Sequence, residues 1–259
     1  MHPSVDLSMV IPAYNAAEFL EDRLSVLSDY LSAASGAWGM SSWEIVVVDD
    51  GSSDGTARLI ESCAVPNVVA VSSPQNEGKF AAIGRGMAKA RGRCRIFTDA
   101  DVPYRCEHIG ELAERVLGAG VHVAVGDRTL AQSTYREALT PLRQLATDSF
   151  KMLTQRLLGA ALGDTQCGLK AFRADVAQAL FPLMQERGFA GDVELLTIAL
   201  DHGLTVDRVP VVLAFHGAST VRPLHDGMRM AAALARIRWR RRSGRYASEA
   251  LSQIAAQRQ

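Results

Sequence analysis

The stretch Arg95-Ile-Phe-Thr-Asp99-Ala-Asp101 decides how this chain is interpreted. A short apolar strand runs directly into two carboxylates that are separated by one residue. Side chains alternate along an extended chain, so both acids are expected to point the same way at the carboxyl end of the strand. In an α/β domain that end is where ligands bind. Two such carboxylates repel each other unless a cation lies between them, and their hard oxygen atoms suit Mg²⁺ or Mn²⁺.

Strand-like and helical segments alternate around this stretch. Buried strands are expected at residues 7–11, 44–48, 67–71, 95–98 and 122–126. Leucines at helical spacing predict a helix that begins near Leu20, and another helix is expected at about residues 80–90. Mainly helical segments are expected up to about residue 202, followed by two short β-rich runs at 205–209 and 211–215. The pattern predicts an α/β fold with a mostly parallel central sheet flanked by helices.

Composition narrows the class of protein. The chain has 259 residues, of which 48% are hydrophobic and 22% charged, enough for one large α/β domain. Its four cysteines have no C-x-x-C spacing, so neither a zinc site nor a disulfide framework is expected. The first residues do not resemble a signal peptide, and no apolar run approaches the ~20 residues that span a bilayer. We therefore expect a cytoplasmic protein.

Positive charge is concentrated near the C-terminus. Residues 227–246 contain seven arginines and no acid, although the whole chain has a formal net charge of zero. Met230, Leu234 and Ile237 form one stripe, which suits a helix lying on an anionic membrane surface. A helix packed on the body, with its arginines solvated or paired, is the equal alternative. No aromatic platform interleaves the arginines, so no nucleic-acid partner is expected.

Six short motifs occur in an order that resembles glycosyltransferase family 2. They are Pro12-Ala-Tyr-Asn15, Val48-Asp-Asp-Gly-Ser-Ser-Asp-Gly-Thr56, Asn76-Glu-Gly-Lys79, Asp99-Ala-Asp101, Gly163-Asp-Thr-Gln-Cys-Gly-Leu-Lys-Ala-Phe172 and Phe189-Ala-Gly-Asp-Val-Glu194. The last two resemble the dolichyl-phosphate glucosyltransferase branch. The resemblance implies a GT-A fold, in which a Rossmann-like domain is fused to an acceptor region. We expect one catalytic domain at 1–226, with a nucleotide half at about 7–101 and an acceptor half at about 102–226, and a basic helix and tail at 227–259.

The resemblance also implies a nucleotide-sugar site across the ends of the first, second and fourth strands. Its expected residues are Pro12, Ala13, Tyr14, Asn15, Asp50, Gly78, Lys79, Asp99, Ala100 and Arg128. Asp50 is expected to accept a hydrogen bond from a ring N–H of the base. This contact would select against bases that lack such a donor. Asp54 is expected to cap backbone amides instead. Lys79 is expected near the phosphates, with a solvated surface lysine as the alternative.

The same resemblance implies the catalytic and metal-binding residues. Asp101 is expected to coordinate Mg²⁺ or Mn²⁺, and Asp99 to contact the ribose or a metal-bound water. His216 is a candidate third ligand, although a lone histidine is more often structural. Asp192 is the candidate general base, with a helix N-cap as the alternative. A phosphate acceptor would need little proton removal, in which case Asp192 would position the acceptor or the sugar.

The acceptor side is expected to include Asp164, Gln166, Gly168 and Arg222. Together these features predict a metal-dependent, inverting transferase that moves glucose from UDP-glucose to a polyprenyl phosphate. Mannosyl transfer from GDP-mannose, transfer to a soluble acceptor and a non-catalytic nucleotide-sugar binding protein remain as alternatives. A lipid acceptor would be met at the bilayer surface, which makes a peripheral position on the cytoplasmic face of the membrane an option. Oligomeric state is left open.

Overall fold

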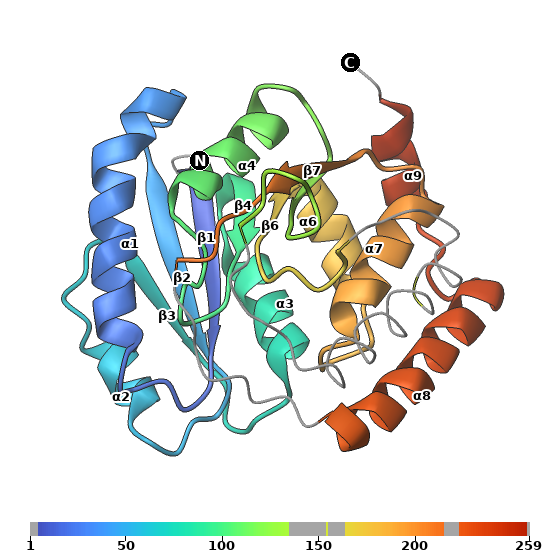
Figure 1. The fold of residues 1–259 in the computed structure, drawn as a ribbon, viewed down its shortest axis with the longest axis horizontal. Helices are drawn as coiled ribbons and strands as arrows, with labels where there is room; N and C mark the ends of the chain where they lie inside the picture. The colour runs from blue at the N-terminus through green and yellow to red at the C-terminus, as the bar shows by residue number, and fades with distance from the viewer. Residues whose placement is uncertain (1–4, 135–153, 155–163, 215–222, 258–259) are drawn as a thin grey trace.

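The computed structural model describes residues 5–134, 154, 164–214 and 223–257 (Figure 1). In this part of the chain, strands form one seven-stranded sheet in the order β3-β2-β1-β4-β6-β5-β7. The strands are β1 (Val5–Ala13), β2 (Trp43–Asp49), β3 (Val68–Ser72), β4 (Gly92–Phe97), β5 (Val123–Asp127), β6 (Lys170–Arg173) and β7 (Val206–Pro210). Strands β1 to β4 run parallel, β5 runs parallel to β7, and β6 is antiparallel to both of its neighbours.

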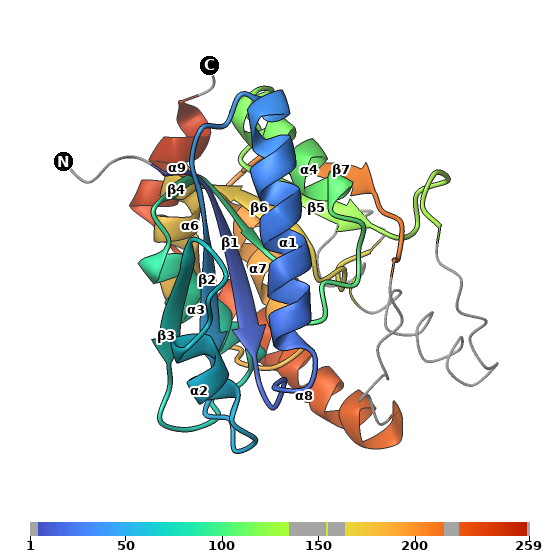
Figure 2. The same ribbon diagram turned by 90° about the vertical axis from the view of Figure 1, so that its left-hand side faces the viewer.

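Two layers of helices cover the sheet. Helices α1 (Leu20–Ala34), α2 (Thr56–Glu61) and α4 (Glu107–Leu117) pack on one face, where α1 lies in front of the strands in Figure 2. Helices α3 (Lys79–Lys89), α6 (Ala174–Leu180) and α7 (Gly191–Asp201) cover the other face. Short 3₁₀ turns lie at Ser35–Trp38 and Phe181–Leu183. The predicted α/β fold with a mostly parallel, helix-flanked sheet is confirmed.

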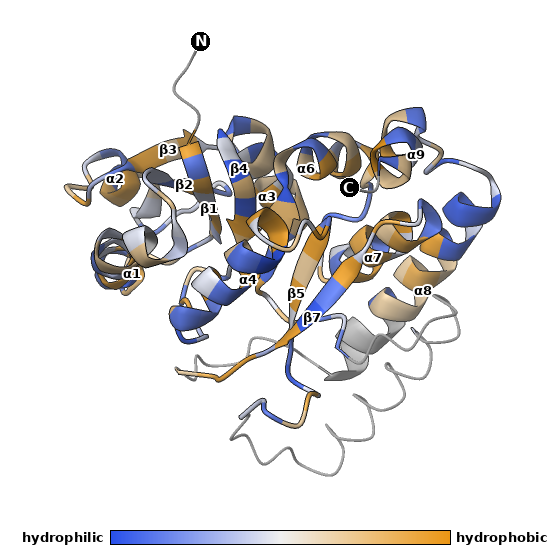
Figure 3. Ribbon diagram, turned by 90° about the horizontal axis from the view of Figure 1, so that it is seen from above, coloured by the Kyte–Doolittle hydropathy of each residue, from blue (hydrophilic) through white to orange (hydrophobic). Residues whose placement is uncertain are grey.

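The apolar strands explain why the sheet is central. Val46, Val47 and Val48 are completely buried, as expected for a parallel strand that is covered on both faces. Figure 3 shows hydrophobic colour on β5, a hydrophilic stretch on β7, and hydrophilic colour on much of α4 and at the C-terminal end of α8 (Pro223–Arg242). Within the described residues, no helix combines the length and the apolar character that a bilayer crossing requires.

Two local expectations need correction. Strand β6 lies where mainly helical segments were expected, because Lys170 and Arg173 hide the short buried strand from an apolarity pattern. The run expected at 211–215 contributes only isolated bridges at Val212 and Leu213, and Phe215 lies outside the described residues. The expectation that Asp54 caps backbone amides is confirmed, because its carboxylate accepts the backbone N–H groups of Ala17 (3.1 Å) and Thr56 (3.0 Å), while Gly55 is the N-cap of α2.

The C-terminal segment packs on the body of the protein. The boundary expected near residue 226 falls inside α8, and α9 (Glu249–Ala256) follows it. Ala233, Leu234 and Ile237 of α8 are buried in the same core cluster as the residues of α3, α6 and α7. Of the two placements considered for the basic helix, the described structure therefore shows the packed one, with the apolar stripe turned toward the protein.

A buried glutamate joins α7 to this C-terminal segment. Glu194 is fully buried, and its carboxylate accepts hydrogen bonds from the backbone N–H groups of Gln185 (2.8 Å) and Glu186 (2.7 Å). It also accepts the hydroxyl of Tyr246 at 2.6 Å and the guanidinium of Arg240 at 3.2 Å. A buried charge is costly unless it is paired and hydrogen-bonded, and these four donors offset that cost for Glu194.

Replacing Glu194 by Gln is therefore expected to lower the free energy of unfolding by about 3 kcal/mol, since Arg240 keeps only Glu186 as a charged partner and the new amide places N–H groups against other donors. Urea unfolding followed by circular dichroism measures the effect. Asp201→Asn is the matched control, because Asp201 pairs with Arg241 at the surface, and it should cost less than about 1 kcal/mol. Equal losses in the two variants would contradict this assignment.

Candidate functional site

A pocket opens where the parallel strands end. It has a volume of about 500 Å³, and the C-terminal ends of β1, β2 and β4 contribute to it together with the loop before α3. Eight of the residues expected at a nucleotide-sugar site line it: Pro12, Ala13, Tyr14, Asp50, Gly78, Lys79, Asp99 and Ala100. The structure therefore gathers residues that are far apart in sequence at the sheet edge where ligands of α/β proteins bind.

Two exposed aromatic side chains stand at this pocket. Tyr14 is 52% exposed and Phe189 is 49% exposed, although large aromatic side chains are usually well buried. Tyr14 follows β1, whereas Phe189 belongs to residues 185–190, which we call the wall segment. Phe189 lies in a quoted motif but was not predicted as a site residue, since sequence spacing alone does not show that its ring is left uncovered.

Asp50 and Asn15 tie the loops of the pocket together. The Asp50 carboxylate is 2% exposed and accepts the backbone N–H groups of Glu77 (3.0 Å) and Gly78 (2.8 Å). The Asn15 side-chain oxygen accepts the backbone N–H of Ser53 at 2.9 Å, and Asn15 is not among the residues lining the pocket. Asp50 both lines the pocket and braces it, so its expected contact with a base remains a prediction.

The two acids lie in a tight turn after β4. The backbone N–H of Val102 donates to the carbonyl of Asp99 at 3.0 Å, and Val102 has a φ of 44°. A positive φ in a β-branched residue is strained, and such strain is often found at functional sites. Burial raises the pKa of Asp101, and the nearby carboxylate of Asp99 adds to this rise.

Lys79 is the cation that the described structure places at the acids. Its ammonium group forms an ion pair with the carboxylate of Asp99. Burial opposes the charged form of Lys79, but the carboxylates of Asp99 and Asp192 outweigh it, so the pKa of Lys79 is raised. Asp99 lies directly over Gly168, where a Cβ atom would come within 2.1 Å of its Oδ2 atom. Gly168 is therefore needed because the carboxylate occupies the space of a side chain.

Asp192 is buried near Lys79 and is not among the residues that line the pocket. It is 2% exposed, and its carboxylate accepts a short hydrogen bond from Nζ of Lys170, which is completely buried on β6. Burial raises the pKa of Asp192, while Lys170 and Lys79 oppose that rise. The N-cap of α7 is Ala190, so Asp192 is not a cap. Sequence reasoning missed Lys170, because nothing in its neighbourhood indicated a strand that would bury it.

Arg128 and Asp164, expected on opposite sides of the reaction, pair with each other. Nε and Nη2 of Arg128 donate to Asp164 at 2.6 and 2.9 Å, and the backbone N–H of Arg128 donates to the same carboxylate. Burial opposes the charge of Asp164, but Arg128 more than offsets it and lowers the pKa of this carboxyl. The backbone N–H of Gln166 donates to the Asp164 carboxylate at 3.0 Å. The side-chain amide of Gln166 donates to the carbonyl of Phe189 at 3.4 Å.

The residues at the acids fit a Mg²⁺ or Mn²⁺ ion. Asp99 and Asp101 supply hard oxygen atoms and interact unfavourably without a cation. Among the described residues no group of three or more histidine, cysteine or acidic side chains gathers as a complete metal site. Mg²⁺ is often held by one or two carboxylates together with substrate phosphates and water, so two acids such as Asp99 and Asp101 could contribute to holding it. His216 and Arg222 lie outside the described residues.

The chain belongs to glycosyl transferase family 2, whose family model matches residues 8–181. A dolichyl-phosphate beta-glucosyltransferase of Trichomonas vaginalis is 31% identical over 79% of this chain and 62% of its own length. A dolichyl-phosphate beta-glucosyltransferase of Dictyostelium discoideum is 29% identical over 92% of this chain and 75% of its own length. The membership in family 2 and the resemblance to this branch are therefore confirmed.

A solved structure shares the fold. Glucosyl-3-phosphoglycerate synthase from Mycobacterium tuberculosis, crystallised with phosphoglyceric acid, aligns with a TM-score of 0.65 at 22% identity. The alignment covers 90% of this chain and 80% of that chain. At this identity the likeness shows the fold alone. Which ligands the present chain binds has to be argued from its own residues.

Asp101→Asn is expected to stabilise the protein at pH 7.5 in the absence of metal. A carboxyl whose folded pKa is raised favours folding below its unfolded pKa, and that contribution is lost as the pH rises through the folded pKa. The neutral amide removes this loss, so the melting temperature of the variant should exceed that of the wild type at pH 7.5. The difference should shrink at acidic pH.

Asp164→Asn is the opposite control. A lowered folded pKa stabilises the protein above the unfolded pKa, and this contribution is lost as the pH falls through the folded pKa. Asp164→Asn should therefore destabilise the protein at pH 7.5 by about 2 kcal/mol, because Arg128 loses a charged hydrogen-bond partner. A lower melting temperature for Asp101→Asn than for the wild type at pH 7.5 without metal would contradict the account of the two acids.

Proposed function

We propose that this chain transfers glucose from UDP-glucose to a polyprenyl phosphate. The observation that carries the proposal is the pair between Lys79 and Asp99, which line the pocket where β1, β2 and β4 end. Asp101 is not among the lining residues, but it follows in the same turn, close enough for the charges of Asp99 and Lys79 to act on its pKa. Relatives named as dolichyl-phosphate beta-glucosyltransferases support the choice of sugar and acceptor. Because the chain spans less than two thirds of one of these relatives, the activity, substrates and partners of the whole protein are proposals.

The donor would bind with its diphosphate at Lys79 and the two acids. Lys79 is the first residue of α3 and lines the pocket, so the positive end of the helix dipole lies at this side of the pocket. A bound divalent cation would neutralise charge on the diphosphate as the glycosidic bond breaks. Asp99 and Asp101 would hold that cation, and a solved structure of the same fold contains Mn²⁺, UDP-glucose and phosphoglyceric acid. Tyr14, Phe19 and Phe189 are aromatic residues that line the pocket and are available to the base.

The transfer would need no strong general base. An oxygen atom of the acceptor phosphate forms a new bond to C1 of glucose, while the bond from C1 to the UDP oxygen breaks and its electron pair leaves with UDP. A phosphate monoester is already an anion at neutral pH, so no proton has to be removed from the attacking oxygen. Attack from the side opposite UDP inverts C1. Asp192, buried against Lys170, then serves to hold Lys79 in position through its charge.

A soluble phosphorylated acceptor is the second candidate. The structural neighbour from Mycobacterium tuberculosis is named for glucosyl transfer to phosphoglycerate, and this chain shares its fold. GDP-mannose remains the rival donor.

Mass spectrometry of the product separates these cases. Purified protein is incubated with each nucleotide sugar and with dolichyl phosphate, undecaprenyl phosphate or 3-phosphoglycerate. We expect a glucosyl phosphoryl lipid from UDP-glucose with Mn²⁺ or Mg²⁺, and none with a chelator. Product from 3-phosphoglycerate alone would favour the second candidate.

Gly168→Ala tests the position of Asp99. The new methyl group would displace the carboxylate, so the Mn²⁺-dependent rise in melting temperature on adding UDP should largely disappear. Gly84→Ala is the matched control, because a Cβ atom there meets no other atom within 4 Å and the rise should persist. An unchanged UDP response in Gly168→Ala would remove Asp99 from the donor site.

A further inference from the structure

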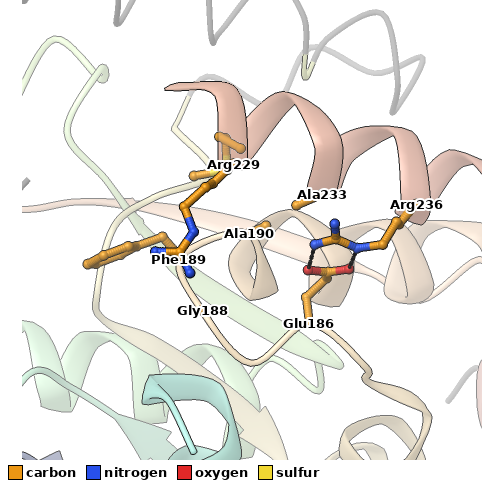
Figure 4. A pocket seen from close by; sticks show the side chains of 8 residues that line it. Glu186, Gly188, Phe189, Ala190, Arg229, Ala233 and Arg236 are labelled. Atoms are coloured by element: carbon orange, nitrogen blue, oxygen red, sulfur yellow. Dashed lines mark hydrogen bonds and ion pairs between the residues drawn. The ribbon is translucent and has the colours of Figure 1, made fainter. Parts of the chain in front are cut away.

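A second hollow adjoins the donor pocket. It has a volume of about 330 Å³ and lies between the wall segment and helix α8 (Figure 4). Gly188 and Phe189 line both this groove and the donor pocket, so the two are neighbours on either side of the wall segment. A molecule in this groove would therefore lie next to the proposed sugar donor.

Most charges that line the groove are already paired. Glu186 accepts Nε and Nη2 of Arg236 at 2.9 and 2.8 Å, as the dashed lines in Figure 4 show, and it also accepts Arg240 at 2.7 Å. Arg229 differs from these arginines. It lines the groove and makes no hydrogen bond or ion pair with any residue that the structure describes. In Figure 4 its side chain extends from α8 toward Phe189 and Gly188.

The rest of the groove is largely apolar. Ala233 is 4% exposed, Met230 packs against the core, and the ring of Phe189 is half exposed. A guanidinium group beside an apolar surface suits a ligand that carries both a phosphate and a hydrocarbon chain, because arginine matches phosphate geometry and the apolar side chains gain from covering hydrocarbon. A free phosphate would use only the first of these features.

We propose that this groove binds the acceptor, with Arg229 on its phosphate and Phe189, Met230 and Ala233 against its first isoprenyl units. The inference rests on the proposed function and goes beyond it by assigning the lipid phosphate to helix α8. It also gives the basic helix a role that differs from lying flat on a membrane, since its apolar stripe packs on the protein. An acceptor bound here would lie next to the donor pocket, since Gly188 and Phe189 line both hollows.

The wall segment is well supported for this task. Glu194 accepts the backbone N–H groups of Gln185 and Glu186, and the carbonyl of Arg187 accepts the backbone N–H of Phe80 at 2.9 Å. Gly78 approaches that carbonyl so closely that a Cβ atom would lie 2.6 Å from it. Contacts to α7 on one side and to the loop before α3 on the other therefore fix the partition between the donor pocket and the groove.

The test is binding of farnesyl phosphate, a short isoprenyl phosphate, measured by isothermal titration calorimetry on the full chain. Arg229→Gln should weaken binding roughly tenfold, the loss expected when a charged hydrogen bond is removed. Arg229→Lys should restore part of the affinity. Arg238→Gln is the matched control, because Arg238 is exposed on α8 and is not among the residues lining the groove. The KM for UDP-glucose should change less than about twofold in every variant.

Equal affinity of wild type and Arg229→Gln, or no binding of farnesyl phosphate by the wild type, would overturn the inference. Binding of inorganic phosphate as tightly as farnesyl phosphate would overturn the assignment of a lipid. A different result would contradict the proposed function alone: the wild type forms no glucosyl phosphoryl lipid from UDP-glucose, although farnesyl phosphate still binds through Arg229. Formation of that lipid with an unchanged acceptor KM in Arg229→Gln would reject the groove and keep the function.

Discussion

The repulsion between two carboxylates at the end of β4 governs the rest of the candidate site. Asp99 and Asp101 share a tight turn, and the pKa of Asp101 is raised by burial and by its neighbour. In the described structure the ammonium group of Lys79 partly relieves this repulsion by pairing with Asp99. The site is therefore suited to accept positive charge. The turn that carries the acids includes Val102 with a positive φ, and Asp99 packs closely over Gly168.

This view couples the donor to the metal. Lys79 cannot give its full charge to a diphosphate while it is paired with Asp99, and Asp99 cannot fully bind a cation while it is paired with Lys79. Arrival of a metal-diphosphate complex would replace one ion pair by two, with Lys79 on phosphate and Asp99 on the cation. Asp192 and Lys170 form a buried pair behind them, so Lys79 keeps a second carboxylate nearby throughout the exchange. Metal and nucleotide would then bind more tightly together than separately.

The sequence predicted those features that depend on local pattern. Buried strands such as Val46–Val48 and the acids that follow β4 could be recognised from apolarity and spacing, and eight predicted donor-site residues line one pocket. Features that depend on tertiary contacts escaped prediction. Lys170 is buried on a four-residue antiparallel strand, Phe189 reaches the pocket from a loop that only the fold brings near, and Arg128 pairs with Asp164 across 36 positions of the chain. The placement of α8 was also open, because its apolar stripe suits a membrane or a protein surface equally well.

The most direct test is to locate Mn²⁺ by anomalous diffraction from crystals grown with UDP. The account predicts a manganese ion in contact with Asp101 or Asp99 and with the diphosphate, and an Nζ atom of Lys79 that has left Asp99 for a phosphate oxygen. A manganese ion distant from both carboxylates, with UDP bound in the pocket and the pair between Lys79 and Asp99 intact, would contradict it.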